Sequence, residues 1–193
     1  MGSSIAHVLD ELEAFHGPQS IVSPADPYHY MVWLHCGYPA SDERCMKGWE
    51  SLRGKVGVEP EQILQASIKR LTEVLSPGGM MPGLRAQRLK EVAKRVAGEF
   101  DGDLAAVLAR SIPAARKLLK TFPNIADPGA DRILLFASVS PVAAVPSNCP
   151  YVVVRIMRGE ASTNYRETYK QAQEEIGGLP QTFAARTRAF LLL

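Results

Sequence analysis

The residues best suited to chemistry lie in and around a short turn, between Phe122 and Ala137. Arg and Lys precede the turn, Pro, Asn, Asp and Gly fill it, and an apolar run of helical character follows. A helix, a tight turn and a second helix form a helix-hairpin-helix, in which backbone N–H groups and a helix N-terminus converge on one point and can bind an anion. Beside basic residues, the natural anion is a nucleic-acid phosphate. The alternative is a helical hairpin whose turn holds no ligand.

Any attraction to nucleic acid must come from local clusters of basic residues, because the net charge is only +2. The three clusters are Arg85, Arg88, Lys90, Lys94 and Arg95; Arg110, Arg116, Lys117 and Lys120; and Arg155, Arg158, Arg166 and Lys170. The alternative, above all for the first cluster, is a solvated helix face with ion pairs one turn apart.

The sequence predicts neither a metal site nor a membrane span. The three cysteines, Cys36, Cys45 and Cys149, form no pair motif and no four-ligand set. The four histidines lack metal-binding spacing with carboxylates. We therefore expect no cofactor in this chain. With no signal peptide and no run near the ~18–20 apolar residues of a span, we expect a cytoplasmic protein.

The sequence predicts that helices position the candidate residues. Apolar residues recur at helical spacing, and Gly, Pro and capping residues separate these stretches. The expected helices span 5–15, 28–37, 42–53, 60–75, 84–99, 103–109, 113–121, the segment after the hairpin turn, 151–157, 167–176 and 183–193, with a loop over 76–83. No strand-like alternation reaches a convincing length, so the fold class is all-α. With 193 residues, 46% of them hydrophobic, the chain can bury a core as one domain or two small lobes.

The segment from Phe122 to Arg155 resembles the core of the endonuclease III family, the helix-hairpin-helix (HhH-GPD) DNA glycosylases of base excision repair. There a hairpin of the form Leu-Pro-Gly-Val-Gly-x-Lys-x-Ala leads, after an apolar helix, to Ala-Val-Asp-Thr-His/Asn and then to an Arg. The residues that fall in register are Pro123, Ala130, Pro141, Ala144, Val145, Asn148 and Arg155. Upstream, Ser41-Asp42 with Lys47, and Leu84-Arg85-Ala86, resemble two further segments of the family. The similarity covers roughly residues 26–193.

The resemblance implies a two-lobed helical fold and a DNA partner. Residues 28–132 would form a six-helix lobe that ends in the helix-hairpin-helix, and residues 1–27 plus 133–193 would form the second lobe. Double-stranded DNA, damaged or distorted, would lie between the lobes, and the protein would be a monomer. Tyr38 and Pro39 match a loop that wedges into the duplex, although Tyr38 could equally pack a helix end. The implied DNA-binding residues are Asn124, Ala126, Asp127, Gly129, Arg132, Lys120, Tyr38 and Arg85.

The sequence departs from the family at its catalytic positions. Pro128 stands where bifunctional members carry a Schiff-base Lys, and Pro146, or Ser147 if the loop shifts by one residue, stands where nearly all members carry a catalytic Asp. Proline offers neither an amine nor a carboxylate, so we expect no AP lyase activity. The two hairpin glycines are replaced by Asn124 and Ala126, and Gly129 could supply the lost conformational freedom.

Two residues are candidates for an altered chemistry, and each has a structural alternative. His35 could act as a general acid or base, or could be a hydrogen-bonded core residue. Asp131 could stabilise a sugar cation, or could brace the fold. Asp127 could cap the hairpin helix or, like Asp131, stabilise a sugar cation. For both aspartates, a negative charge beside a phosphate site would repel DNA, so we do not expect a catalytic role.

Three functions are compatible with these observations. The first is a base-excision-repair DNA glycosylase with monofunctional or altered activity. The second is a catalytically inactive protein that binds distorted duplex DNA, and the third is a helical adaptor for protein interactions. Many relatives bind a four-iron four-sulphur cluster through four closely spaced cysteines after a helix that resembles Phe190–Leu193. The cluster would require a native protein that extends beyond Leu193.

Overall fold

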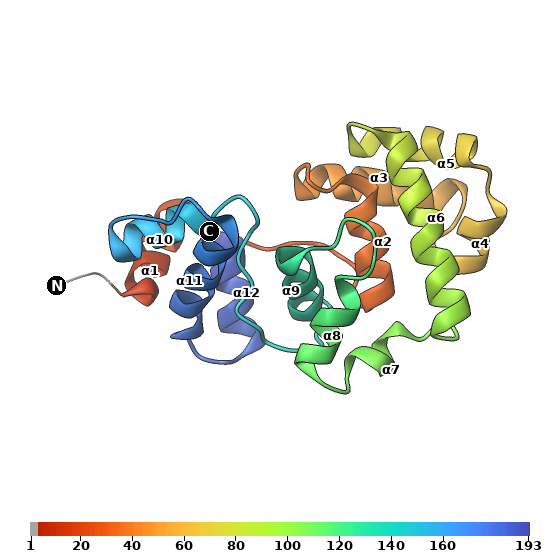
Figure 1. Ribbon diagram of the computed structural model, residues 1–193. Coiled ribbons are helices and arrows are strands. Elements are labelled where there is room, and N and C mark those ends of the chain that lie inside the picture. Colours follow the sequence, from red (N-terminus) through yellow and green to blue (C-terminus); the bar gives the residue numbers. More distant parts are fainter. Residues whose placement is uncertain (1–3) are drawn as a thin grey trace. The chain divides into compact units, whose positions relative to one another are not determined.

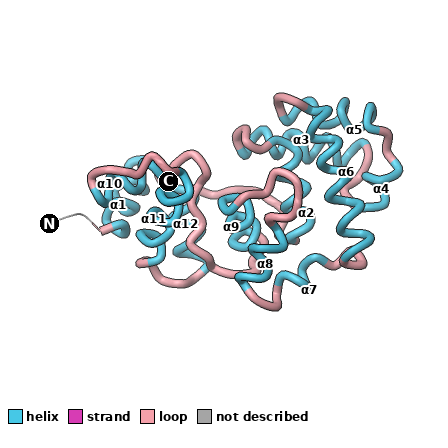
Figure 2. Tube along the Cα trace, in the orientation of Figure 1, coloured by secondary structure: helices cyan, strands magenta, loops and turns pink. Residues whose placement is uncertain are grey.

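The structure is a computed structural model, and it describes residues 4–193 (Figure 1). Within these residues the secondary structure consists of helices joined by loops (Figure 2), which confirms the all-α prediction. Backbone contacts group the chain into two compact units. One unit is Val22–Ile125, and the other contains the residues up to Ile21 together with Ala126–Leu193.

The unit Val22–Ile125 surrounds one central helix, α2 (Pro27–Gly37), in which every residue except His29 is buried. The other helices of this unit are α3 (Asp42–Lys55), α4 (Pro60–Gln65), α5 (Ile68–Leu75), the 3-10 helix η1 (Ser76–Gly78), α6 (Pro82–Glu99), α7 (Leu104–Leu108) and α8 (Ile112–Leu119). Helix α2 packs against α3 and α6, and α6 also packs against α4 and α5. A helix that is apolar on all sides must be enclosed in this way.

Close packing of α2 on α3 depends on two glycines. A Cβ atom at Gly37 would lie 2.6 Å from the backbone nitrogen of Cys45, and a Cβ at Gly48 would collide with the carbonyl oxygen of Cys36. Neither contact can relax by moving a flexible side chain, because the opposing atoms belong to backbone. The two backbones therefore approach each other at a distance that only glycine permits.

The second unit joins the two ends of the chain. Its helices are α1 (Ile5–His16), α9 (Asp127–Phe136), α10 (Pro150–Arg158), α11 (Tyr165–Gly177) and α12 (Phe183–Leu192). Its main core contains Ile5, Leu9, Val145, Val153, Val154, Tyr169, Ala172, Ile176, Ala189 and Leu192. On the surface, Arg188 of α12 forms ion pairs with Asp10 and Glu13 of α1 at 2.8 and 2.7 Å. This unit therefore contains residues more than 170 positions apart in the sequence.

The helix predicted over 60–75 is in fact two helices, and this prediction was wrong. Ala66 is extended (ψ 140°) and ends α4, and Ser67 begins α5 with its side chain accepting a hydrogen bond from the backbone N–H of Arg70. A serine that can cap a helix favours a new start at this position. The apolar spacing of the two short helices is continuous enough to conceal the break.

Candidate nucleic-acid interface and pocket

The hairpin turn follows α8 and precedes α9, and its conformation depends on Asn124. This residue has φ 61°, the left-handed region that asparagine enters more readily than most residues. Gly129 has no such role, since it lies inside α9. Asp127 is the first residue of α9 and does not cap it, since Ala126 occupies the cap position without a side-chain bond. The expectations for Gly129 and for Asp127 as a cap were therefore wrong, whereas an asparagine does supply the special conformation.

His35 is a core residue and not an acid or base in an open site. Its ring is 4% exposed, and its Nδ1 and Nε2 atoms lie 2.8 and 2.9 Å from the carbonyl oxygens of Met31 and Pro123. Burial lowers the pKa of His35 below its ordinary value and outweighs the opposite effect of the two carbonyl contacts, and the neutral ring that this favours can donate a hydrogen bond to only one of the two carbonyls. The ring therefore fastens the start of the hairpin turn to α2. Of the two predicted roles of His35, the structure shows the hydrogen-bonded core residue.

Arg85 is enclosed by backbone and cannot contact DNA. Its guanidinium donates hydrogen bonds to the carbonyl oxygens of Cys36, Leu75, Gly79 and Met80, and the residue is 4% exposed. It fastens the loop after α5 to the end of α2. We correct its predicted role accordingly. Five donors in a fixed plane explain why an arginine can satisfy so many carbonyls at once.

Other members of the first basic cluster also form contacts within this unit. Lys90 donates to the carbonyl of Leu64 at 2.8 Å. Arg95 donates to the carbonyl of Thr121 at 2.8 Å, pairs with Glu99, and lies 4.2 Å from the centre of the Phe122 ring. The predicted ion pair one turn apart is present for Arg95 and Glu99, whereas the carbonyl contacts of Lys90 and Arg95 join residues distant in the sequence and were not predicted. Arg95 also holds the first residue of the turn in place.

Arg132 was predicted to contact DNA, but its guanidinium lies against two aromatic rings and the residue is buried. It is 8% exposed, and its guanidinium carbon lies 5.1 Å from the Phe190 ring centre and 5.8 Å from that of Phe136. Asp131, next to it, is fully buried and accepts hydrogen bonds from the Tyr169 hydroxyl (2.9 Å) and the Gln173 amide (2.8 Å). Asp131 therefore braces α9 against α11 and has no open face for substrate.

The loop that begins at Tyr38 lies near a loop with two exposed methionines, which were not among the predicted site residues. Tyr38 is half-buried at the end of α2. The loop after η1 comes close to the loop that Tyr38 begins, because a Cβ at Gly79 would lie 3.9 Å from the Cβ of Ala40. This loop exposes Met80 (88%) and Met81 (64%) to solvent. Apolar side chains of this kind can enter a base step. The sequence feature that could have indicated this surface is the pair of methionines in a Gly- and Pro-rich loop, where no helical pattern explains them.

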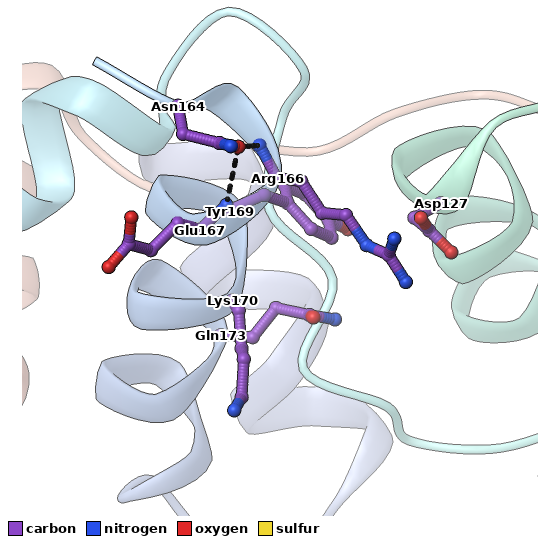
Figure 3. A pocket seen from close by; sticks show the side chains of 7 residues that line it. All are labelled: Asp127, Asn164, Arg166, Glu167, Tyr169, Lys170 and Gln173. Atoms are coloured by element: carbon purple, nitrogen blue, oxygen red, sulfur yellow. Dashed lines mark hydrogen bonds between the residues drawn. The ribbon is translucent and has the colours of Figure 1, made fainter. Parts of the chain in front are cut away.

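A polar pocket of about 390 Å³ lies within the second unit, between the first residue of α9 and the N-terminal half of α11 (Figure 3). The lining residues are Asp127, Asn164, Arg166, Glu167, Tyr169, Lys170 and Gln173. Arg166 extends its guanidinium toward Asp127. Burial and the neighbouring Asp131 carboxylate raise the pKa of Tyr169, so that its phenol remains a donor. The sequence placed Arg166 and Lys170 in a basic cluster, but it did not reveal that they share a cavity with Asp127.

The two proline positions contribute no reactive group. Pro128 is buried in the first turn of α9, and Pro146 is half-buried in the loop before α10. The next residue in that loop, Ser147, accepts a hydrogen bond from the Tyr165 hydroxyl through its carbonyl oxygen at 2.9 Å. The exposed members of the predicted site are Lys120, Asn124 and Ala126. Within residues 4–193 no three His, Cys, Asp or Glu side chains gather as metal ligands, and no helix is both long and apolar enough to cross a bilayer.

Comparison with known proteins gives one distant relative by sequence and several by structure. No protein-family model matches the sequence. A thymine/uracil-DNA glycosylase of Pyrobaculum aerophilum is 28% identical over 97 residues, which are 50% of this chain and 38% of that protein. The aligned part thus spans well under half of the relative's length.

Solved DNA glycosylase structures match nearly the whole chain. A non-covalent endonuclease III–DNA complex has a TM-score of 0.73 at 16% identity, over 97% of this chain and 82% of that one. The H. pylori 3-methyladenine DNA glycosylase MagIII, bound to 1,N6-ethenoadenine, has a TM-score of 0.70 at 16% identity, over 98% and 94%. These matches cover both units and confirm the predicted fold class. The chain therefore has the two-lobed, all-helical fold of the HhH-GPD DNA glycosylases, to which endonuclease III belongs.

Proposed function

We propose that this protein binds damaged or distorted duplex DNA and releases a modified base as a monofunctional glycosylase of base excision repair. The observation that carries the proposal is the match of almost the entire chain to DNA glycosylases, including DNA-bound endonuclease III. Exposed Lys117, Lys120 and Asn124, at the end of α8 and in the hairpin turn, would meet the phosphates. The monomeric state of the protein and its cytoplasmic location remain predictions from the sequence.

The proposed reaction uses water and not a protein amine. A lyase forms a Schiff base between an amine and the opened sugar. Pro128 has no amine, and no lysine occurs between Lys120 and Lys170. We therefore expect no covalent complex with abasic-site DNA after borohydride treatment. Efficient trapping would contradict the proposal and would direct attention to Lys120, Lys170 or the N-terminal amine.

A second candidate function is supported by the two prolines themselves. Pro128 and Pro146 replace both reactive groups of the resembled family, and such a pair of changes favours a protein that binds distorted DNA without cutting it. The names of the similar proteins suggest the probes that separate the two functions. A panel should contain duplexes with a U:G pair, a T:G pair and 1,N6-ethenoadenine.

DNA binding is tested by fluorescence anisotropy on a duplex with a tetrahydrofuran abasic analogue and on the undamaged duplex. We expect tighter binding to the analogue and an affinity that falls with salt, by about 0.9 log units per decade of salt for each phosphate contact. Lys120→Gln should lower this slope by about one contact. The control Lys55→Gln, at the end of α3, removes a similar exposed charge and should leave the slope unchanged. Absence of binding at 50 mM salt would favour the adaptor function.

A further inference from the structure

The pocket of the second unit contains a carboxylate that faces its cavity. Three acidic residues lie in or beside this pocket. Glu167 accepts a hydrogen bond from the Ser162 hydroxyl at 2.7 Å, and its carboxylate points away from Asp127 (Figure 3). Asp131 is buried behind the wall. Asp127 is half-buried at the first position of α9 and faces the cavity opposite Arg166.

The surroundings of Asp127 favour a substrate that combines a developing cation with a phosphate. Arg166 and Lys170 line the same cavity, and neither has an ion-pair partner among residues 4–193. An isolated carboxylate would repel the DNA backbone, but a guanidinium opposite it offsets this repulsion and can itself bind a phosphate oxygen. One negative and two positive side chains therefore line the cavity.

We propose that Asp127 is the catalytic carboxylate and that Arg166 binds the phosphate beside the target sugar. This inference rests on the proposed glycosylase function and names the residues that would perform it. Asp127 directly precedes Pro128, the position at which bifunctional members of the resembled family carry an amine. The substrate class is a deoxynucleotide of duplex DNA that is turned out of the stack.

The reaction balances without a cofactor. The bond between the base nitrogen and C1′ of the sugar breaks, and its electron pair leaves with the base. The Asp127 carboxylate stabilises the positive charge that develops on the sugar. A water oxygen forms the new bond to C1′, and the proton that the water loses goes to Asp127 and then to solvent. The released base takes a proton from solvent, which leaves free base and an abasic site with a C1′ hydroxyl.

The test compares Asp127→Asn with Asp127→Glu and with Glu160→Gln. Glu160 is exposed in the loop between α10 and α11, so its replacement removes the same charge from the same unit. Base release is measured under single-turnover conditions on duplexes with U:G, T:G or 1,N6-ethenoadenine. Binding is measured separately on the abasic-analogue duplex. Loss of one electrostatic group in a reaction centre typically costs about 10²–10³ in rate, and this is the fall expected for Asp127→Asn.

The accompanying measurements separate catalysis from folding and from DNA binding. Asp127→Asn should bind the abasic duplex at least as tightly as the wild-type protein, since a negative charge near phosphate is removed. Its Tm should change little, because an acidic residue in a first helical turn contributes only about 0.3–1 kcal/mol. Asp127→Glu should recover part of the rate, and Glu160→Gln should retain all of it.

Each contrary result has a distinct meaning. If Asp127→Asn released base at more than a tenth of the wild-type rate, Asp127 would not be the catalytic carboxylate. If the wild-type protein bound the abasic duplex but released no base from any probe, the catalytic role would also be overturned, and the DNA-binding part of the proposed function would survive. If the wild-type protein did not bind the duplex, the proposed function itself would fail.

Discussion

Replacing Arg85 separates a structural role from a DNA contact. The guanidinium donates to four carbonyl oxygens in the interior, at 3.0 Å for Met80, 3.1 Å for Leu75 and 2.6 Å for Gly79, with Cys36 as the fourth. In Arg85→Met all four oxygens lose a charged donor, and those of Cys36 and Leu75 are buried away from water. The buried charge also disappears, and this offsets part of the loss.

The expected loss of stability is large for the replacement of an arginine, a residue that usually lies on the protein surface. Each unsatisfied buried acceptor costs about 1–3 kcal/mol, and two of the four acceptors are buried, so the loss should be about 3–5 kcal/mol in total. For a protein of this size 1 kcal/mol changes Tm by about 2–4 °C, so Arg85→Met should lower Tm by about 6–20 °C. Arg85→Lys should lose less, because an ammonium keeps the charge but lacks the planar set of donors.

The assay combines thermal unfolding with DNA titrations at a temperature where both proteins are folded. The control is Lys94→Met, an exposed position on the same helix. We expect a normal Tm for the control, a low Tm for Arg85→Met, and the same salt slope of DNA binding for both. A Tm within 2 °C of wild type, together with a slope reduced by about 0.9, would show that Arg85 is a phosphate contact and would refute the structural role.

Three further predictions concern the turn and the buried polar groups. Burial lowers the pKa of His35 below 6.5, whereas a histidine of the unfolded chain takes up a proton near pH 6.5, so the folded protein should lose stability as the pH drops below about 6.5. Urea unfolding at pH 7 and at pH 5.5 measures this loss. The loss should be smaller in His35→Gln than in the control His16→Gln. Asn124→Ala should lose about 1–2 kcal/mol because alanine resists φ 61°, whereas Asn124→Gly should retain wild-type stability and DNA affinity in the same assays. Tyr169→Phe should cost about 1–3 kcal/mol in urea unfolding, since the buried Asp131 loses a donor, and an unchanged free energy of unfolding would contradict this role.

Local patterns were sufficient to predict most of the helices, because most are specified by nearby residues. The spacing of apolar residues located α1, α6 and α11, and the Gly- and Pro-rich stretch located the loop before α6. The break at Ala66 and Ser67 was missed, because a capping serine competes with a continuous apolar pattern only weakly. Elements of this kind depend little on the rest of the chain.

The functional surface could be predicted only in part, because burial of charge is decided by tertiary contacts. Arg85 and Lys120 look alike in a sequence, yet the first is enclosed by four carbonyls and the second is exposed. The pocket combines Asp127 with residues about forty positions later, and no local pattern indicates that they meet. The left-handed backbone conformation of Asn124 was predicted correctly, because this preference is a property of the residue itself.

The central claim is that water-dependent base excision persists on this fold without the usual lysine. It is tested most directly by incubating excess protein with end-labelled U:G, T:G and 1,N6-ethenoadenine duplexes and resolving the strands with and without hot alkali. Base release by water leaves an abasic site that only alkali cleaves, so we predict strand breaks at the modified base in the alkali-treated lanes alone. Strand breaks without alkali would reveal a lyase amine, and intact strands in every lane would show that the protein binds DNA without excising these bases.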